Sequence, residues 1–237
     1  MAASFYSNSI HVDFDSVLEM DERGMISMFQ ALVASGLQGF LGCTAVVYEE
    51  ALVEFFANGR LPVDGLGDLS EMPKDVVFDA RSIVSLSGEP ISLSGRKNQM
   101  KFEFRLLCDI MEKAISVKAG SFNAITVEKF SLMMAVVCSV RMNWAKFLFS
   151  ILKKMVTPGS KQAKVFAIQI SLLLATIPTL ELGESSEFPA SKILSKKTVH
   201  RFVSINDRDG AEEVTGVSKA KGCIEEKSCC RCWSNCT

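Results

Sequence analysis

Apolar residues recur at helical spacing along most of this 237-residue chain. Spacings of three and four residues place apolar side chains on one face of a helix, as in a helix packed against a core. The pattern predicts a first long helix over residues 16–35, which Gly36 is placed to end. Its apolar side carries Met25, Met28, Phe29, Leu32 and Val33. A second helix is predicted from Thr44, as its N-cap, to Asn58.

Four more helices are predicted in the second half of the chain. They span residues 100–117, 126–140, 143–156 and 160–176. The third has Asn143 as its predicted N-cap, and its apolar stripe includes Trp144, Ile151 and Met155. The short connections between these helices favour a compact antiparallel bundle.

The remaining segments predict turns, short strands and a tail. Residues 60–99 are rich in proline and glycine and predict turns around at most one short helix, near residues 73–82. Alternating patterns predict strands only over residues 11–14 and 198–205. Residues 206–237 contain few apolar side chains and are predicted to be disordered. The predicted fold class is mainly α: a helical bundle with at most a few short peripheral strands and a disordered C-terminal tail.

Charge divides the chain near the segment that interrupts the helical pattern. Residues 1–90 contain 14 acidic and 4 basic residues, whereas residues 91–205 contain 7 acidic and 17 basic residues. Over the whole chain the formal net charge is only −1. We therefore predict an acidic helical N-terminal part (1–90), a basic helical bundle (91–205) and the Cys-rich tail (206–237).

The strongest chemical signal is a basic region, residues 129–164, which contains no acidic residue. The candidate interaction surface within it comprises Arg141, Lys146, Lys153, Lys154, Lys161 and Lys164. Three interpretations are open: a solvated helix face, a docking surface for the acidic half of the same or another copy, and a surface for nucleic-acid phosphates or anionic membranes. The aromatic residues here fall on the apolar stripe of the third helix, which leaves none for stacking on bases.

Signatures of catalysis and of metal binding are weak. The two histidines, His11 and His200, lie in predicted strands without a nucleophile motif around them. The glycines at positions 36, 39 and 42 lie between helices and lack the Gly-Lys-Ser/Thr ending of a phosphate-binding loop. Five cysteines in the tail have spacings that match no zinc site. We expect no enzymatic activity, cofactor, metal or small-molecule substrate.

No targeting signal is recognisable in the sequence. The first 20 residues contain no basic residue and no continuous apolar stretch, so no signal peptide is predicted, and we expect an intracellular location in the cytoplasm or nucleus. The longest charge-free runs are residues 24–48 and 165–180. Glycine and glutamine interrupt the first, and the second is too short to cross about 30 Å of hydrocarbon, so we predict buried helices and no membrane span.

Several sequence blocks resemble a known family. They are residues 31–42 (ALVASGLQGFLG), 46–56 (VVYEEALVEFF), 66–81 (LGDLSEMPKDVVFDAR), 143–144 (NW) and 155–158 (MVTP). Together they are similar to plant retroelement-derived proteins with the plant transposon protein domain, over most of residues 5–206. The resemblance implies a helical, non-enzymatic module of undetermined biochemical role, with no catalytic residues to carry over. Members of that family have a longer segment where this chain has residues 58–61, and the tail after Asn206 is unlike them.

These observations lead to two functional hypotheses. The first is a retroelement-derived helical interaction or structural module that associates with itself through its acidic and basic halves. The alternative is a nucleic-acid-binding module that uses the basic region 129–164, with an affinity that falls steeply as salt rises.

Overall fold

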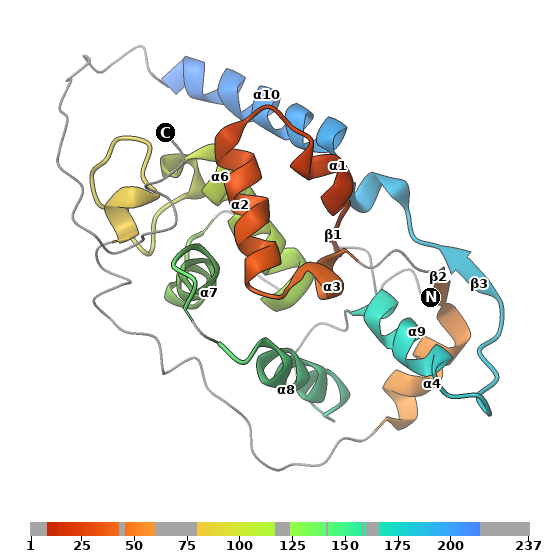
Figure 1. The fold of residues 1–237 in the computed structure, drawn as a ribbon. Helices are drawn as coiled ribbons and strands as arrows, with labels where there is room; N and C mark the ends of the chain where they lie inside the picture. The colour runs from red at the N-terminus through yellow and green to blue at the C-terminus, as the bar shows by residue number, and fades with distance from the viewer. Residues whose placement is uncertain are drawn as a thin grey trace.

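The computed structural model of the chain describes residues 9–42, 46–59, 80–116, 124–140, 142–157, 159 and 166–213, with side chains as far as Asn206. In these ranges the protein is mainly α-helical and contains two small sheets of two strands each (Figure 1). This is the fold class that the apolar pattern predicts.

The first half of the chain alternates short strands and helices. Its elements are β1 (His11–Val12), α1 (Phe14–Leu18), α2 (Arg23–Ala34), α3 (Gln38–Leu41), β2 (Val46–Tyr48) and α4 (Glu49–Asn58). The single helix predicted over residues 16–35 is wrong, because two helices, α1 and α2, occupy this range. The Asp13 side chain accepts a hydrogen bond from the Ser16 amide and so starts α1 early. The extended backbone of Glu22 (ψ 102°) then separates α1 from α2.

Helix α2 ends at the predicted glycine. Gly36 has a φ of 78°, which glycine adopts without steric cost. Its amide donates to the Val33 carbonyl, and the Leu37 amide donates to the Leu32 carbonyl, so the last carbonyls of the helix are satisfied. The predicted apolar side of α2 is confirmed, because four of its five residues are buried and Val33 is partly buried.

Helix α4 begins at Glu49, later than predicted, because the preceding residues form strand β2. In the antiparallel pairing of β2 with β3 (Ser185–Glu187), Val47 lies opposite Ser186. The β-branched residues of β2 suit a strand, but their partner is far along the chain, so local spacing did not reveal the pairing. The predicted N-cap, Thr44, lies outside the described residues.

The second half supplies the remaining helices and the partner strands. Its elements are η3 (Lys97–Gln99), α6 (Phe102–Ile110), the π-helical segment η4 (Met111–Ser116), α7 (Val127–Val137), α8 (Trp144–Val156), α9 (Ala167–Ala175), β3, η5 (Ala190–Lys192), β4 (Ile193–Leu194) and α10 (Lys196–Glu213). Helix α9 begins at Ala167, because Phe166 has a left-handed backbone with a φ of 64°. Residues 160–165, where this helix was predicted to start, lie outside the described residues.

Residues 198–205 are helical, so the strand predicted there is wrong. They belong to α10, in which Val199 is buried and Phe202 and Val203 pack against the core at spacings of three and four residues. The Ser195 amide donates to Thr198 Oγ1 at 2.7 Å, as in a capping box. The backbone of α10 continues to Glu213, past the predicted start of the disordered tail at residue 206. Residues 214–237 lie outside the described part.

One hydrophobic core includes residues from both halves of the chain. Helix α2 packs against α6 and α7, α4 packs against α8 and α9, and α10 packs against α1 (Figure 1). Strand β1 pairs in parallel with β4, which joins residues 11–12 to residues 193–194. The change of charge near residue 90 is therefore not a boundary in the packing. The helices of the second half also pack on helices of the first.

Candidate interaction surface

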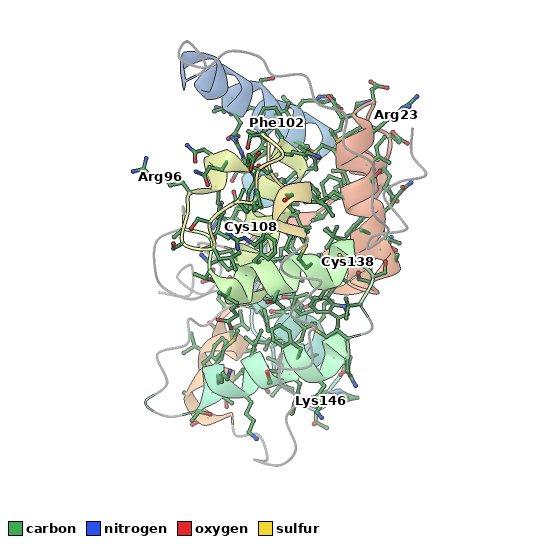
Figure 2. The ribbon with its side chains drawn as sticks, turned by 90° about the vertical axis from the view of Figure 1, so that its left-hand side faces the viewer. Arg23, Arg96, Phe102, Cys108, Cys138 and Lys146 are labelled. Carbon is green, nitrogen blue, oxygen red and sulfur yellow. The ribbon has the colours of Figure 1, made fainter. Side chains whose placement is uncertain are left out.

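The predicted basic surface is centred on helix α8. Asn143 caps this helix as predicted, because its side chain accepts a hydrogen bond from the Lys146 amide at 2.9 Å. Lys146 and Lys154 are exposed, and Figure 2 shows Lys146 at the end of the molecule opposite α10. Arg141, Lys161 and Lys164 lie outside the described residues, so the structure places only the α8 members of the predicted set.

Lys153, a member of the predicted interaction surface, does not lie on an exposed face. Its side chain is buried, with 7% of the residue exposed, although it lies within about 20° of Lys146 around the helix axis. Ser150 is buried on the same side, so the second half of α8 is covered on two sides, which a helical wheel cannot show. Within the described part of the chain, the Lys153 ammonium has no hydrogen-bond partner.

Phe149 corrects the prediction that every aromatic residue of this region lies on the buried stripe. It is 41% exposed and lies on the same side of α8 as Lys146. An aromatic ring beside a lysine is a feature of surfaces that bind nucleic-acid strands or other proteins.

Helix α4 presents an acidic face next to α8. Glu50, Val53 and Glu54 are exposed, and Val53 and Glu54 lie three and four residues after Glu50. Helix α4 packs against both α8 and α9, and the three helices lie together at one end of the molecule (Figure 1). Opposite charges on two neighbouring helices therefore face solvent at the same end.

Helix α9 and the turn that follows it add exposed apolar side chains at this end. Between Phe166 and Leu180 the sequence contains no charged residue. Leu172, Leu173 and Ile177 are 43%, 52% and 44% exposed. We use the name α4/α8/α9 surface for this set: Glu50, Val53, Glu54, Lys146, Phe149, Lys154, Leu172, Leu173 and Ile177. Five of the eight large apolar residues that are exposed in the described ranges belong to it.

A buried ion-pair network lies elsewhere, between α6, η4 and α7, and the sequence did not predict it. Glu112 of η4 accepts hydrogen bonds from Lys97 at 2.6 Å and from Lys129 at 2.5 Å. Lys97 also donates to Asp109 at 2.7 Å. Lys129 begins the predicted basic region, but this pairing neutralises it. The paired residues come from the consecutive elements η3, α6, η4 and α7 and lie 12, 15 and 17 residues apart. Among short spacings, only the Asp109/Glu112 spacing of three residues could have hinted at the network.

Burial and charge set the protonation of this network. Burial alone would lower the pKa of Lys97, but the nearby Cys108 sulfur and the hydrogen bonds to Asp109 and Glu112 outweigh that effect, so this pKa is raised. Burial raises the pKa of the Cys108 thiol to about 11. At neutral pH the lysine stays charged and the thiol stays protonated, so neither group is a nucleophile under these conditions.

A polar cavity of about 640 Å³ borders this network. It lies between residues 96–98, α6 and α10, and its lining includes Arg96, Lys97, Arg105, Asp109, Phe202 and Asn206. None of these residues was singled out in the sequence, because they come from three separate segments.

In the described ranges, no three His, Cys, Asp or Glu side chains gather closely enough to hold a metal ion. Among the helices of these ranges, none has the length and apolar character needed to cross a membrane. No family model matches the sequence, and no curated protein and no solved structure is significantly similar to it.

Proposed function

We propose that this protein is a helical interaction module that associates with a second copy of itself through the α4/α8/α9 surface. The observation that carries the proposal is the contact between α4 and α8, whose exposed charges are opposite in sign. In a dimer with twofold symmetry, α4 of each copy faces α8 of the other, because such an interface pairs the same two patches twice.

The apolar side chains of this surface support the same proposal. Large exposed apolar residues on helices in contact, with charged residues on the same helices, are typical of protein–protein interfaces. Phe149 and Leu173 would supply buried contact area, while the glutamates of α4 and the lysines of α8 would set the orientation of the two copies.

The resemblance to plant retroelement-derived proteins agrees with a structural role. Proteins that assemble need a recognition surface rather than a catalytic centre. The retroelement origin and the lack of enzymatic activity stay predictions.

Nucleic-acid binding is the second candidate, and the exposure of Phe149 favours it. A base could stack on this ring while Lys146 contacts a phosphate. Two observations weigh against it, since Lys153 is buried and Lys129 is paired with Glu112. The glutamates of α4 would also repel phosphates that approach α8.

Sedimentation velocity on the reduced full chain tests self-association. We expect a dimer at low salt that dissociates as salt rises, because the screening length falls from about 10 Å at 0.1 M to about 3 Å at 1 M. Reversing the charge of α8 with Lys146→Glu and Lys154→Glu should weaken the dimer at least tenfold. Reversing α4 with Glu50→Lys and Glu54→Lys should do the same.

The decisive sample is an equimolar mixture of the two charge-reversed variants. Two copies of the same variant repel each other, whereas the two different variants have complementary charges, so the mixture should form a heterodimer. The matched control is Arg23→Glu with Lys197→Glu, two exposed positions at the opposite end, which should dimerise like the parent protein. A monomer at low salt and micromolar concentration contradicts the proposal, and a shift seen only with a generic oligonucleotide favours the second candidate.

A further inference from the structure

A second site lies at the opposite end of the molecule from the α4/α8/α9 surface. It is the polar cavity between residues 96–98, α6 and α10, with a volume of about 640 Å³. Pockets that hold small ligands measure roughly 300–1,000 Å³, so this one has room for a ligand larger than a simple ion.

Arg105 forms a fixed, positively charged part of the cavity lining. It is 7% exposed, and its Nε donates to the Met100 carbonyl at 2.6 Å. Its terminal nitrogens donate to the Asn98 carbonyl and, at 3.3 Å, to Asn206 Oδ1. A guanidinium held in this way keeps its orientation before a ligand arrives, which lowers the entropic cost of binding.

The other charged side chains of the lining are of two kinds: Lys97 and Asp109 are ion-paired, and Arg96 is exposed. Lys97 and Asp109 bind each other, and Lys97 also binds Glu112, so these groups largely neutralise one another. Arg96 is exposed and extends from the edge of the molecule (Figure 2). With three basic residues against one acidic residue, the lining is positive overall and favours an anion.

Phe202 supplies an apolar aromatic wall on the α10 side. A positive rim and an aromatic ring within one cavity match two parts of a nucleotide, which are its phosphate and its flat base. The Asn206 amide is bonded to Arg105 and to the Phe202 carbonyl and so holds these two walls together. We propose that this cavity binds a nucleoside monophosphate, with the phosphate at Arg96 and the base against Phe202.

Other ligand classes fit the cavity less well. An apolar ligand would meet charged and amide groups over most of the lining. Inorganic phosphate would satisfy the rim but would leave most of the volume and the Phe202 ring without contact. A nucleotide could arrive free or as part of a single strand, and the experiment distinguishes these two sources.

Isothermal titration calorimetry with the reduced full chain is the direct test. Its probes are adenosine 5′-monophosphate, adenosine, inorganic phosphate and a short single-stranded oligonucleotide. The Lys146→Glu, Lys154→Glu variant is used as the background, so that the proposed self-association does not contribute heat. We expect adenosine monophosphate to bind at least tenfold more tightly than adenosine or phosphate, and more weakly as salt rises. If the oligonucleotide binds each site as tightly as adenosine monophosphate or more tightly, the natural ligand is a single-stranded nucleic acid.

Variants of the lining residues distinguish specific binding in the cavity from nonspecific electrostatic attraction. Arg96→Glu should weaken nucleotide binding at least tenfold, whereas Arg23→Glu, an exposed arginine on α2, should leave it unchanged. Phe202→Leu should weaken nucleotide binding and leave phosphate binding as it is, with thermal unfolding used to confirm that the variant folds. No heat with adenosine monophosphate, equal affinity for phosphate and nucleotide, or the same loss in both arginine variants would each overturn the proposal.

Discussion

Ser139 occupies a backbone conformation that favours glycine. It follows α7 with a φ of 49°, and the hydrogen bonds around it repeat those at Gly36 after α2. The Ser139 amide donates to Val136, and the Val140 amide donates to Ala135. A residue with a Cβ pays about 1–2 kcal/mol for this conformation, and glycine does not. Glycine also gives the unfolded chain more conformational entropy, which offsets part of that gain in stability.

We therefore expect Ser139→Gly to raise the free energy of unfolding by about 0.5–1 kcal/mol. The reciprocal change, Gly36→Ser, should lower it by a similar amount, since an added Cβ at Gly36 meets no atom within 4 Å and only the backbone strain is at issue. Urea denaturation of both variants measures these changes. Equal stability of the two variants and the parent protein would contradict this interpretation.

His11 makes stability depend on pH. Burial lowers the pKa of His11 from 6.5 to about 4, although a hydrogen bond with the Leu41 backbone acts in the opposite direction. Between these two values the unfolded chain binds a proton that the folded protein does not. The free energy of unfolding should therefore fall as pH decreases from 6.5 to 4, by at most about 3 kcal/mol at 1.36 kcal/mol per pKa unit.

Denaturant unfolding at several pH values, compared between the parent protein and His11→Gln, isolates this contribution. The carboxylates titrate in both proteins, so the difference between the two pH profiles belongs to His11. Parallel profiles from pH 7 to pH 4 would rule out the buried neutral histidine.

The structural role of a single residue could be predicted from the sequence where it depends only on nearby residues. Gly36 and Asn143 sit at helix ends, and their roles depend on neighbours within four residues. Lys153 was not predictable, because its burial depends on what covers a second side of α8.

At the scale of elements, the π-helical segment η4 presents Glu112 to two lysines at once. Segments of π-helix often mark functional or strained positions in a helix, and here the segment places a buried carboxylate between Lys97 and Lys129. Removing the charge of Glu112 would take the shared partner from two largely buried lysines, of which Lys97 keeps Asp109.

Glu112→Gln should therefore lower the free energy of unfolding by about 3 kcal/mol, the usual cost of breaking a buried ion pair from one side. The exposed Glu89→Gln serves as the control and should change stability by less than about 0.5 kcal/mol. Chemical denaturation at neutral pH gives both values. A loss below about 1 kcal/mol for Glu112→Gln would show that water or the remaining groups replace the carboxylate.

The predicted elements were right where helical spacing coincides with a capping residue. Helices α7 and α8 begin within a residue or two of the predicted positions, after Thr126 and Asn143, whose side chains accept hydrogen bonds from the next turn. The paired strands were harder to place, because β2 and β3 find each other across more than half of the chain. Helix α10 was predicted as a strand because its apolar residues are few and also fit a short alternation.

At the scale of the whole molecule, charge and packing follow different divisions of the chain. The sequence has an acidic half and a basic half, but helices of both halves share one core. The candidate site could be predicted only in part, since the lysines of α8 were found without the acidic face of α4 that lies beside it. The cavity near Arg96 could not be predicted, because it forms where α10 meets residues 96–109, and Arg105 and Asn206 are 101 residues apart in the chain.

The pairing of β1 with β4 also governs the order in which this protein can fold on the ribosome. His11 pairs with Ile193, so the first strand of the described chain has no partner until residue 193 has been made. At about 5–20 residues per second, that delay lasts roughly 10–40 s. During this time the buried faces of α1 and α2 lack part of their cover, and a nascent chain in that state is a natural substrate for chaperones that bind exposed apolar segments.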